Sequence, residues 1–130
     1  MNKTSYLLLR LGVAISMFGH GLVRMPKLAG FSGWMTKSFE HSLLHAALVK
    51  PFSYLLPFAE LITGLLLLAG LFTKQALIAG SVVMIALVFG STMIESWEAI
   101  PSQLIHLAFF AVLLHFIGSN SFAVDHPVRK

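Results

Sequence analysis

Four long apolar segments constrain this chain more than any other feature of its sequence. They cover approximately residues 6–23, 52–72, 76–94 and 100–117. Each is long enough, or nearly so, to cross a hydrocarbon core that takes about 20 helical residues. Continuous apolar runs without two-residue alternation favour helices, since only helices and closed barrels satisfy their backbone hydrogen bonds in lipid. The sequence therefore predicts an all-α fold, an integral membrane four-helix bundle.

The composition agrees with a membrane protein. Hydrophobic residues make up 57% of the chain and charged residues 11%, whereas soluble domains are about a quarter charged. A length of 130 residues allows one domain, so we expect a single membrane domain over residues 1–130. The net charge of +4 does not indicate a nucleic-acid partner, because the basic residues lie mostly between the apolar segments. The absence of cysteine excludes thiol redox chemistry and thiolate ligands from this chain.

The connection between the first two apolar segments is long enough to form structure of its own. Gly30 and Gly33 predict a turn in it, and an amphipathic helix is expected over about residues 33–48. This helix would lie along the membrane surface or fold over the mouth of the bundle. Its apolar stripe would consist of Met35, Phe39, Leu43 and Ala46 or Ala47.

The basic residues predict how the bundle is oriented. One membrane side would hold Lys3, Arg10, Lys74, Arg129 and Lys130. The other side would hold Arg24, Lys27, Lys37 and Lys50, together with Glu40, Glu95 and Glu98. The first set is slightly richer and lies in the short segments, so both termini are expected in the cytoplasm. Arg10, near the start of the first span, is expected to extend its side chain to the lipid headgroups.

Seven polar residues in or beside the apolar segments are expected on one membrane side: His20, Arg24, Glu60, Thr92, Glu95, Gln103 and His106. Glu60 is the only acidic residue inside any of these segments, where a carboxylate costs on the order of 2.5 to 3.5 kcal/mol. His20 and Arg24 share a helix face at a spacing of four. His106 lies near the start of the fourth span at a similar depth, whereas His115 points in the opposite direction. A ligand-binding site of His20, Arg24, Glu60 and His106 is therefore our hypothesis.

Other interpretations of these residues stay open. Glu60 with Arg24 or His20 can equally be a buried clamp between the first two spans. Two histidines on different helices can ligate a haem, but this pattern is too unspecific for us to expect one. His41 and His45 lie four residues apart without a third ligand nearby, so no metal site is expected.

Three motifs resemble the DoxX family of small bacterial membrane proteins. They are the His-Gly-x-x-Arg motif at His20, Gly21 and Arg24, the Pro-Lys-Leu-x-Gly-Phe motif at 26–31, and the apolar stretch Leu56 to Thr73. The resemblance implies a four-helix protein of the bacterial inner membrane and draws attention to His20, Arg24 and Glu60. The family name derives from quinone-linked thiosulfate oxidation, and some relatives are linked to membrane redox complexes. Many relatives have a lysine where this chain has Arg24, which keeps the charge but changes the hydrogen-bond geometry.

Two functions from different classes follow. The first is a quinone- or redox-associated subunit, in which the polar residues bind a quinone headgroup and an apolar slot holds its tail. The second is a non-catalytic accessory or assembly subunit whose polar cluster is only a clamp; a proton or small-solute carrier has less support. Expected partners are the lipid bilayer and membrane or redox proteins, with a homo-oligomer also open, and enzyme status is undetermined. The slot would be lined by Phe18, Phe58, Phe109 and Phe110.

Overall fold

The computed structural model describes residues 1–125, which form five α-helices and no strand. The helices are α1 (Lys3–Arg24), α2 (Leu28–Ser38), α3 (Ala46–Ala69), α4 (Thr73–Met93) and α5 (Ile100–His115). Short 3-10 turns flank two of these helices. Met25–Lys27 precedes α2, Trp97–Ala99 precedes α5, and Ile117–Ser119 follows α5. Four helical stretches are long and apolar enough to cross a membrane: Lys3–Ser38, which contains α1 and α2, then Ala46–Ala69, Thr73–Met93 and Trp97–His115. The predicted all-α membrane bundle is confirmed.

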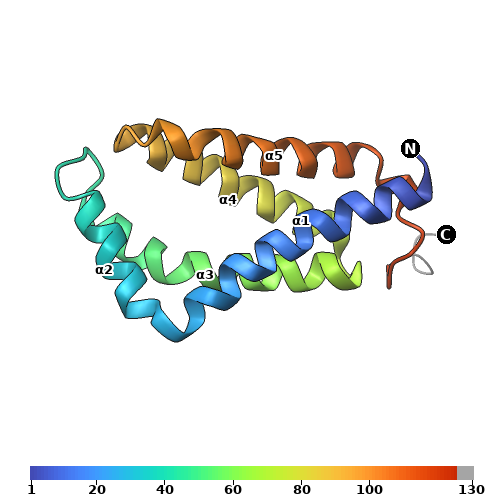
Figure 1. Ribbon diagram of the computed structural model, residues 1–130, viewed down its shortest axis with the longest axis horizontal. Helices are drawn as coiled ribbons and strands as arrows, with labels where there is room; N and C mark the ends of the chain where they lie inside the picture. Colours follow the sequence, from blue (N-terminus) through green and yellow to red (C-terminus); the bar gives the residue numbers. More distant parts are fainter. Residues whose placement is uncertain (126–130) are drawn as a thin grey trace.

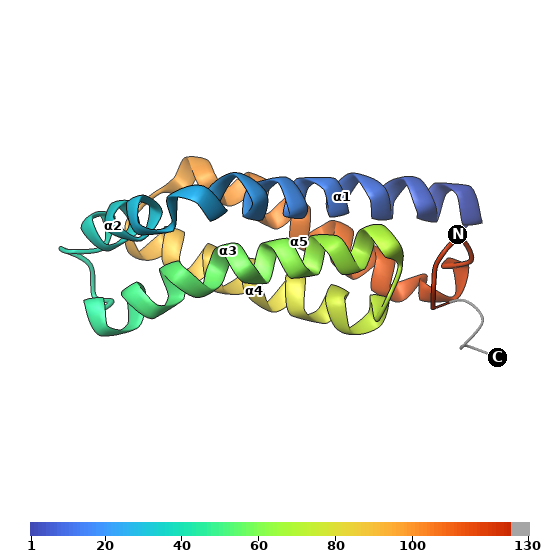
Figure 2. The same ribbon diagram turned by 90° about the horizontal axis from the view of Figure 1, so that it is seen from below.

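The four long helices lie side by side, with α2 and the following turn at one end and the chain's N-terminus at the other (Figures 1 and 2). They pack mainly as two pairs, α1 with α3 and α4 with α5. The end that carries α2 collects the end of α1, the start of α3, the end of α4 and the start of α5. We call it the α2 end, and the opposite one the terminal end. Successive long helices therefore run in opposite directions, as the predicted grouping of polar residues at one end requires.

Two glycines bring α1 and α3 into backbone contact. A Cβ added to Gly21 would lie 2.5–2.7 Å from the backbone and Cβ of Leu61. A Cβ added to Gly64 would collide in the same way with the backbone of Phe18. Small residues of this kind permit close approach between membrane helices, which associate through van der Waals packing because lipid supplies no hydrophobic driving force between them.

The apolar core fills the bundle from the terminal end to its middle. Tyr6 is fully buried there, and its hydroxyl donates a hydrogen bond to the carbonyl oxygen of Leu113 at 2.8 Å. Gly80 of α4 lies against the ring of Phe110, which is also fully buried and joins α4 to α5. The other members of this core include Val13, Ala14, Met17, Leu67, Leu77 and Met84.

Arg10 does not reach the headgroups as expected, and this prediction is wrong. Its side chain is only 2% exposed and points to the segment that follows α5. Nη1 donates to Asn120 Oδ1 at 2.5 Å, and Nη2 donates to the carbonyl oxygen of Phe122 at 2.9 Å. Asn120 in turn donates to Thr73 Oγ1 at 3.0 Å. These acceptors pair Nη1 and Nη2 of the buried guanidinium, so extension to water is unnecessary.

The start of α4 is capped from a distant part of the chain. The sequence predicts a loosely ordered end from Asp125 to Lys130, but Asp125 accepts hydrogen bonds from the backbone N–H groups of Phe72 (2.8 Å) and Thr73 (2.7 Å). Phe72 has a left-handed conformation (φ 50°) and supplies no cap of its own. Asp125 therefore satisfies helix-start donors that would otherwise lack a partner. Residues 126–130 lie outside the described part of the chain.

The connection between α1 and α3 differs from its predicted form. An amphipathic helix was expected over about 33–48, but the helix here is α2, which ends at Ser38. The turn expected at Gly30 and Gly33 is absent, because both glycines lie inside α2. Residues 39–45 turn, because Ser42 Oγ donates to the Phe39 carbonyl oxygen at 2.7 Å and competes with helical hydrogen bonding. Leu43, expected on the apolar stripe, is 91% exposed.

We predict that alanine at Gly21 or Gly64 destabilises the bundle by about 1–3 kcal/mol or more, because each new Cβ collides with backbone that cannot yield. Thermal unfolding in mild detergent measures the effect. Gly12→Ala and Gly19→Ala are the matched controls on α1, since nothing lies within 4 Å of a Cβ at either position. Equal melting temperatures for the two pairs of variants would contradict the close contact.

Candidate functional site

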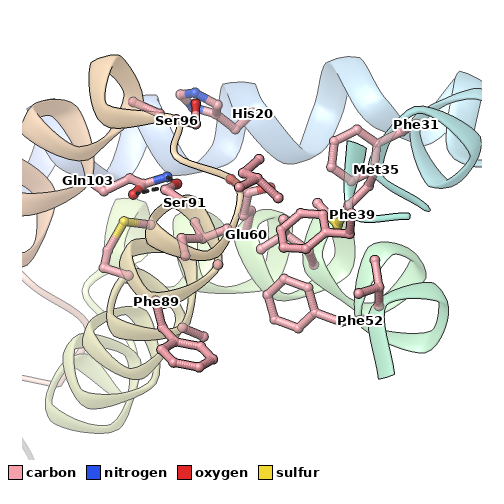
Figure 3. A pocket seen from close by; sticks show the side chains of 18 of the residues that line it. His20, Phe31, Met35, Phe39, Phe52, Glu60, Phe89, Ser91, Ser96 and Gln103 are labelled. Atoms are coloured by element: carbon pink, nitrogen blue, oxygen red, sulfur yellow. Dashed lines mark hydrogen bonds between the residues drawn. The ribbon is translucent and has the colours of Figure 1, made fainter. Parts of the chain in front are cut away.

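A partly open cavity of about 520 Å³ lies at the α2 end of the bundle, and we call it the chamber (Figure 3). All five helices contribute to its walls. Met17 and Met84, which belong to the apolar core, also line it, so the chamber begins where the core ends. The lining includes all four predicted site residues, His20, Arg24, Glu60 and His106.

An ion pair between α1 and α3 forms the most polar part of the chamber. Arg24 Nη1 donates to Glu60 Oε1 at 2.5 Å. The two partners differ in exposure, because the Glu60 side chain is 3% exposed and that of Arg24 is 27% exposed. The Arg24 guanidinium also lies over the ring of Phe31, 4.5 Å from its centroid, which adds a cation–π contact from the start of α2. Glu60 is thus held by a cation that still reaches the chamber.

The two histidines meet beside this ion pair. Their ring centroids lie 6.2 Å apart, and the planes are almost perpendicular (88°). Ser16 joins them, since its carbonyl oxygen accepts from His20 Nδ1 at 2.6 Å and its hydroxyl lies 2.7 Å from His106 Nε2. His106 Nδ1 donates to the Ser102 carbonyl oxygen at 2.8 Å. One serine on α1 therefore positions histidines from two helices.

These hydrogen bonds determine the tautomers of the neutral rings. A carbonyl oxygen only accepts, so both Nδ1 atoms carry a proton. Neutral His106 then accepts the Ser16 hydroxyl proton at Nε2, and both of its nitrogens are engaged. His20 Nε2 is left as a lone-pair acceptor with no hydrogen-bond partner within residues 1–125. The pair thus offers one free basic nitrogen, and His106 has no free nitrogen for a haem iron.

Serine and glutamine side chains extend the polar wall between α4 and α5. Gln103 Nε2 and Ser91 Oγ lie 3.0 Å apart, a contact drawn as a dashed line in Figure 3. Gln103 was expected on this membrane side, whereas sequence reasoning missed Ser16, Ser91 and Ser96. The spacing of four between Ser16 and His20 was the available signal for Ser16, because it places both on one helix face.

The apolar wall comes from different residues than predicted. None of Phe18, Phe58, Phe109 and Phe110, the expected slot residues, lines the chamber. Phe110 is buried in the core, while Phe58 and Phe109 are exposed on the outside of the bundle. The aromatic rings of the wall come instead from the α2 connection and from α3 and α4 (Figure 3). They are Phe31, Trp34, Phe39, Phe52 and Phe89.

The remaining histidines lie elsewhere. His45 caps α3, since its Nδ1 accepts from the backbone N–H of Ala47 at 3.1 Å, and His41 lies 3.4 Å from Glu40. His115 packs edge-on against Phe116, at the terminal end. Within residues 1–125, no group of three or more His, Asp or Glu side chains is arranged to hold a metal ion.

Comparison with known proteins connects the chamber to a protein family. The family model described as DoxX matches residues 5–94, more than half of the chain. The matched range contains His20, Arg24 and Glu60, whereas His106 lies beyond it. No curated protein and no solved structure matches the chain.

We predict an asymmetric response to breaking the ion pair. Arg24→Gln leaves the Glu60 carboxylate buried without a cation and should cost about 3–5 kcal/mol of unfolding free energy. Glu60→Gln should cost less, because Arg24 can still reach water. The double variant should be more stable than Arg24→Gln alone, since it removes the buried charge, and thermal unfolding of all four proteins measures this cycle. Additive losses would show that the two side chains are not coupled.

Proposed function

The chain belongs to the DoxX family, and from that premise and the chamber's geometry we propose that it is a quinone-binding subunit of a membrane redox system. The observation that carries the proposal is a single cavity with aromatic and aliphatic walls on one side and Arg24, Glu60, His20 and His106 on the other. Its volume of about 520 Å³ is within the range of small-molecule sites, which are mainly apolar with a few polar groups that orient the ligand.

The hydrogen-bonding groups suit both redox states of a quinone headgroup. The oxidised ring presents carbonyl oxygens, which accept hydrogen bonds, and Arg24 has N–H groups beyond the one that it donates to Glu60. The reduced ring presents hydroxyls, which donate, and His20 Nε2 is a free acceptor in the neutral tautomer. His20 and Glu60 are therefore the candidates for proton exchange with a bound quinol.

The chain's proposed part in the reaction is to hold the quinone and to exchange protons. Oxidation of a quinol releases two protons and two electrons. The chamber offers proton acceptors, whereas the chain has no cysteine for thiol redox chemistry. We assign the electrons to a redox partner protein, which makes this chain a subunit or an associate of a larger system.

We propose the bacterial inner membrane as the location, with both termini in the cytoplasm. Because Arg10 and Arg24 are directed into the protein, neither contributes a flanking charge to the topology bias. By the sequence, Lys3, Lys74 and the C-terminal Arg129 and Lys130 are the basic residues then expected on the terminal side. The α2 side keeps Lys27, Lys37 and Lys50. The terminal side remains richer in basic residues, and this supports the cytoplasmic placement.

A second candidate function is an accessory or assembly subunit in which the ion pair is a clamp. It is favoured by the position of the Arg24–Glu60 contact, which joins α1 to α3 at the chamber end of their interface. The fourth span also supports it, because little of its apolar stretch is buried within the bundle. The exposed apolar face of this span can pack against lipid, a membrane partner or a second copy of the chain.

We predict that the protein purified in mild detergent retains a quinone, detected by mass spectrometry of its organic extract. Ala86→Phe places a phenyl ring in the chamber, where it competes with a bound headgroup, and should abolish retention. Ala79→Phe is the matched control, since Ala79 is an exposed α4 residue outside the chamber lining. Circular dichroism and gel filtration verify that both variants fold.

The Arg24→Gln/Glu60→Gln double variant separates the two candidate functions. Two amides can still hydrogen-bond between α1 and α3, so a clamp would largely survive, whereas a site that needs the charged groups would release its quinone. Normal quinone retention by the double variant or by Ala86→Phe would refute the quinone proposal. A wild-type extract without quinone, together with a membrane partner that still co-purifies with the double variant, would favour the accessory role.

A further inference from the structure

A second pocket lies beside the connection between α2 and α3 and has a different character from the chamber. Its volume is about 720 Å³, and it shares only Phe39 and Leu44 with the chamber lining. These two side chains separate the chamber from the second pocket. Most of the second lining is polar or small, and it includes Lys37 and Lys50. We call it the lysine pocket.

The two lysines bring positive charge to this pocket from two helices. Lys37 lies in the last turn of α2 and Lys50 near the start of α3. Within residues 1–125, neither lysine forms an ion pair with a carboxylate. The one acidic residue of the lining, Glu40, has its Oε1 3.4 Å from His41 Nε2. Lys37 and Lys50 are therefore available to an external anion.

Neutral groups add hydrogen-bond donors to the same pocket. Because His45 Nδ1 accepts from Ala47 N–H, the neutral ring carries its proton on Nε2 and is a donor there. The Tyr54 hydroxyl also lies in the lining and has no hydrogen-bond partner within residues 1–125. Two cations with additional donors form a site suited to a phosphate group, whose oxygens accept several hydrogen bonds.

The position along α3 favours a lipid as the source of that phosphate. Lys50 precedes the apolar run that begins at residue 52, so it lies at headgroup depth. Below it, Tyr54, Phe58 and Ile62 follow at four-residue spacing, and all three are exposed on the outside of the bundle. An acyl chain can extend along this stripe while the phosphate of its headgroup accepts hydrogen bonds from the two lysines in the pocket.

We propose that the lysine pocket binds the phosphate of an anionic phospholipid. This site is separate from the chamber, so it stands or falls independently of the quinone proposal. The ligand chemistry is a phosphate mono- or diester, which a free phosphate would partly share. The probes must therefore differ in their acyl chains and in their net charge.

The test compares short-chain phosphatidylglycerol, short-chain phosphatidylcholine and inorganic phosphate on the full-length protein in detergent. Thermal unfolding and native mass spectrometry measure binding of each probe. Lys37→Gln/Lys50→Gln removes the pocket's cations, and all of the exchanged side chains are exposed, so folding is not at risk. Lys27→Gln/Lys74→Gln is the control with the same change in net charge, since neither residue lines the lysine pocket.

We expect phosphatidylglycerol to bind the wild type and the control variant, and to bind Lys37→Gln/Lys50→Gln about tenfold more weakly, as follows from the loss of two exposed ion pairs. Phosphatidylcholine should bind weakly to all three proteins. If phosphatidylglycerol binding is weakened equally in the two double variants, the loss is due to net charge alone and the proposed site is wrong. Inorganic phosphate binding as tightly as phosphatidylglycerol would overturn the assignment to a lipid.

Discussion

Backbone contact between α1 and α3 is the interaction on which the rest of the structure depends. Gly21 meets Leu61 and Gly64 meets Phe18 too closely for any Cβ. In a membrane, helix association relies on such packing and on polar contacts between helices. The Arg24–Glu60 ion pair joins the same two helices one turn beyond Gly21, so one interface combines both kinds of interaction.

The chamber results from the way the four long helices pack as two pairs. Because α1 pairs with α3 and α4 pairs with α5, the two pairs must be held together by a shared core, and that core fills the bundle only from the terminal end to Met17 and Met84. At the α2 end the connection between α1 and α3 covers the space between the pairs. Polar side chains that would be costly in lipid lie around this space, where Arg24 pairs with Glu60, Ser16 contacts both histidines, and Gln103 contacts Ser91.

The two inward-facing arginines show how differently one residue type is used at the two ends. Arg10 is held by Asn120 and the Phe122 carbonyl oxygen, which ties the segment after α5 to the first span. Arg24 is paired with Glu60 and keeps part of its guanidinium in the chamber. The first is held by two neutral acceptors with the Asp125 carboxylate nearby, and it has a structural role. The second retains unused donors beside a cavity, and only that arrangement is suited to a ligand.

The sequence by itself determined the membrane bundle and the end of it that His20, Arg24, Glu60 and His106 share, because span length and helical period are local properties. It could not determine which apolar rings line the chamber, since Phe18, Phe58, Phe109 and Phe110 are as apolar as the rings that do. Nor could it predict that Asn120 binds Arg10 or that α2 ends at Ser38. Those outcomes depend on which helix faces meet and on hydrogen bonds between residues far apart in the chain, and only the tertiary structure decided them.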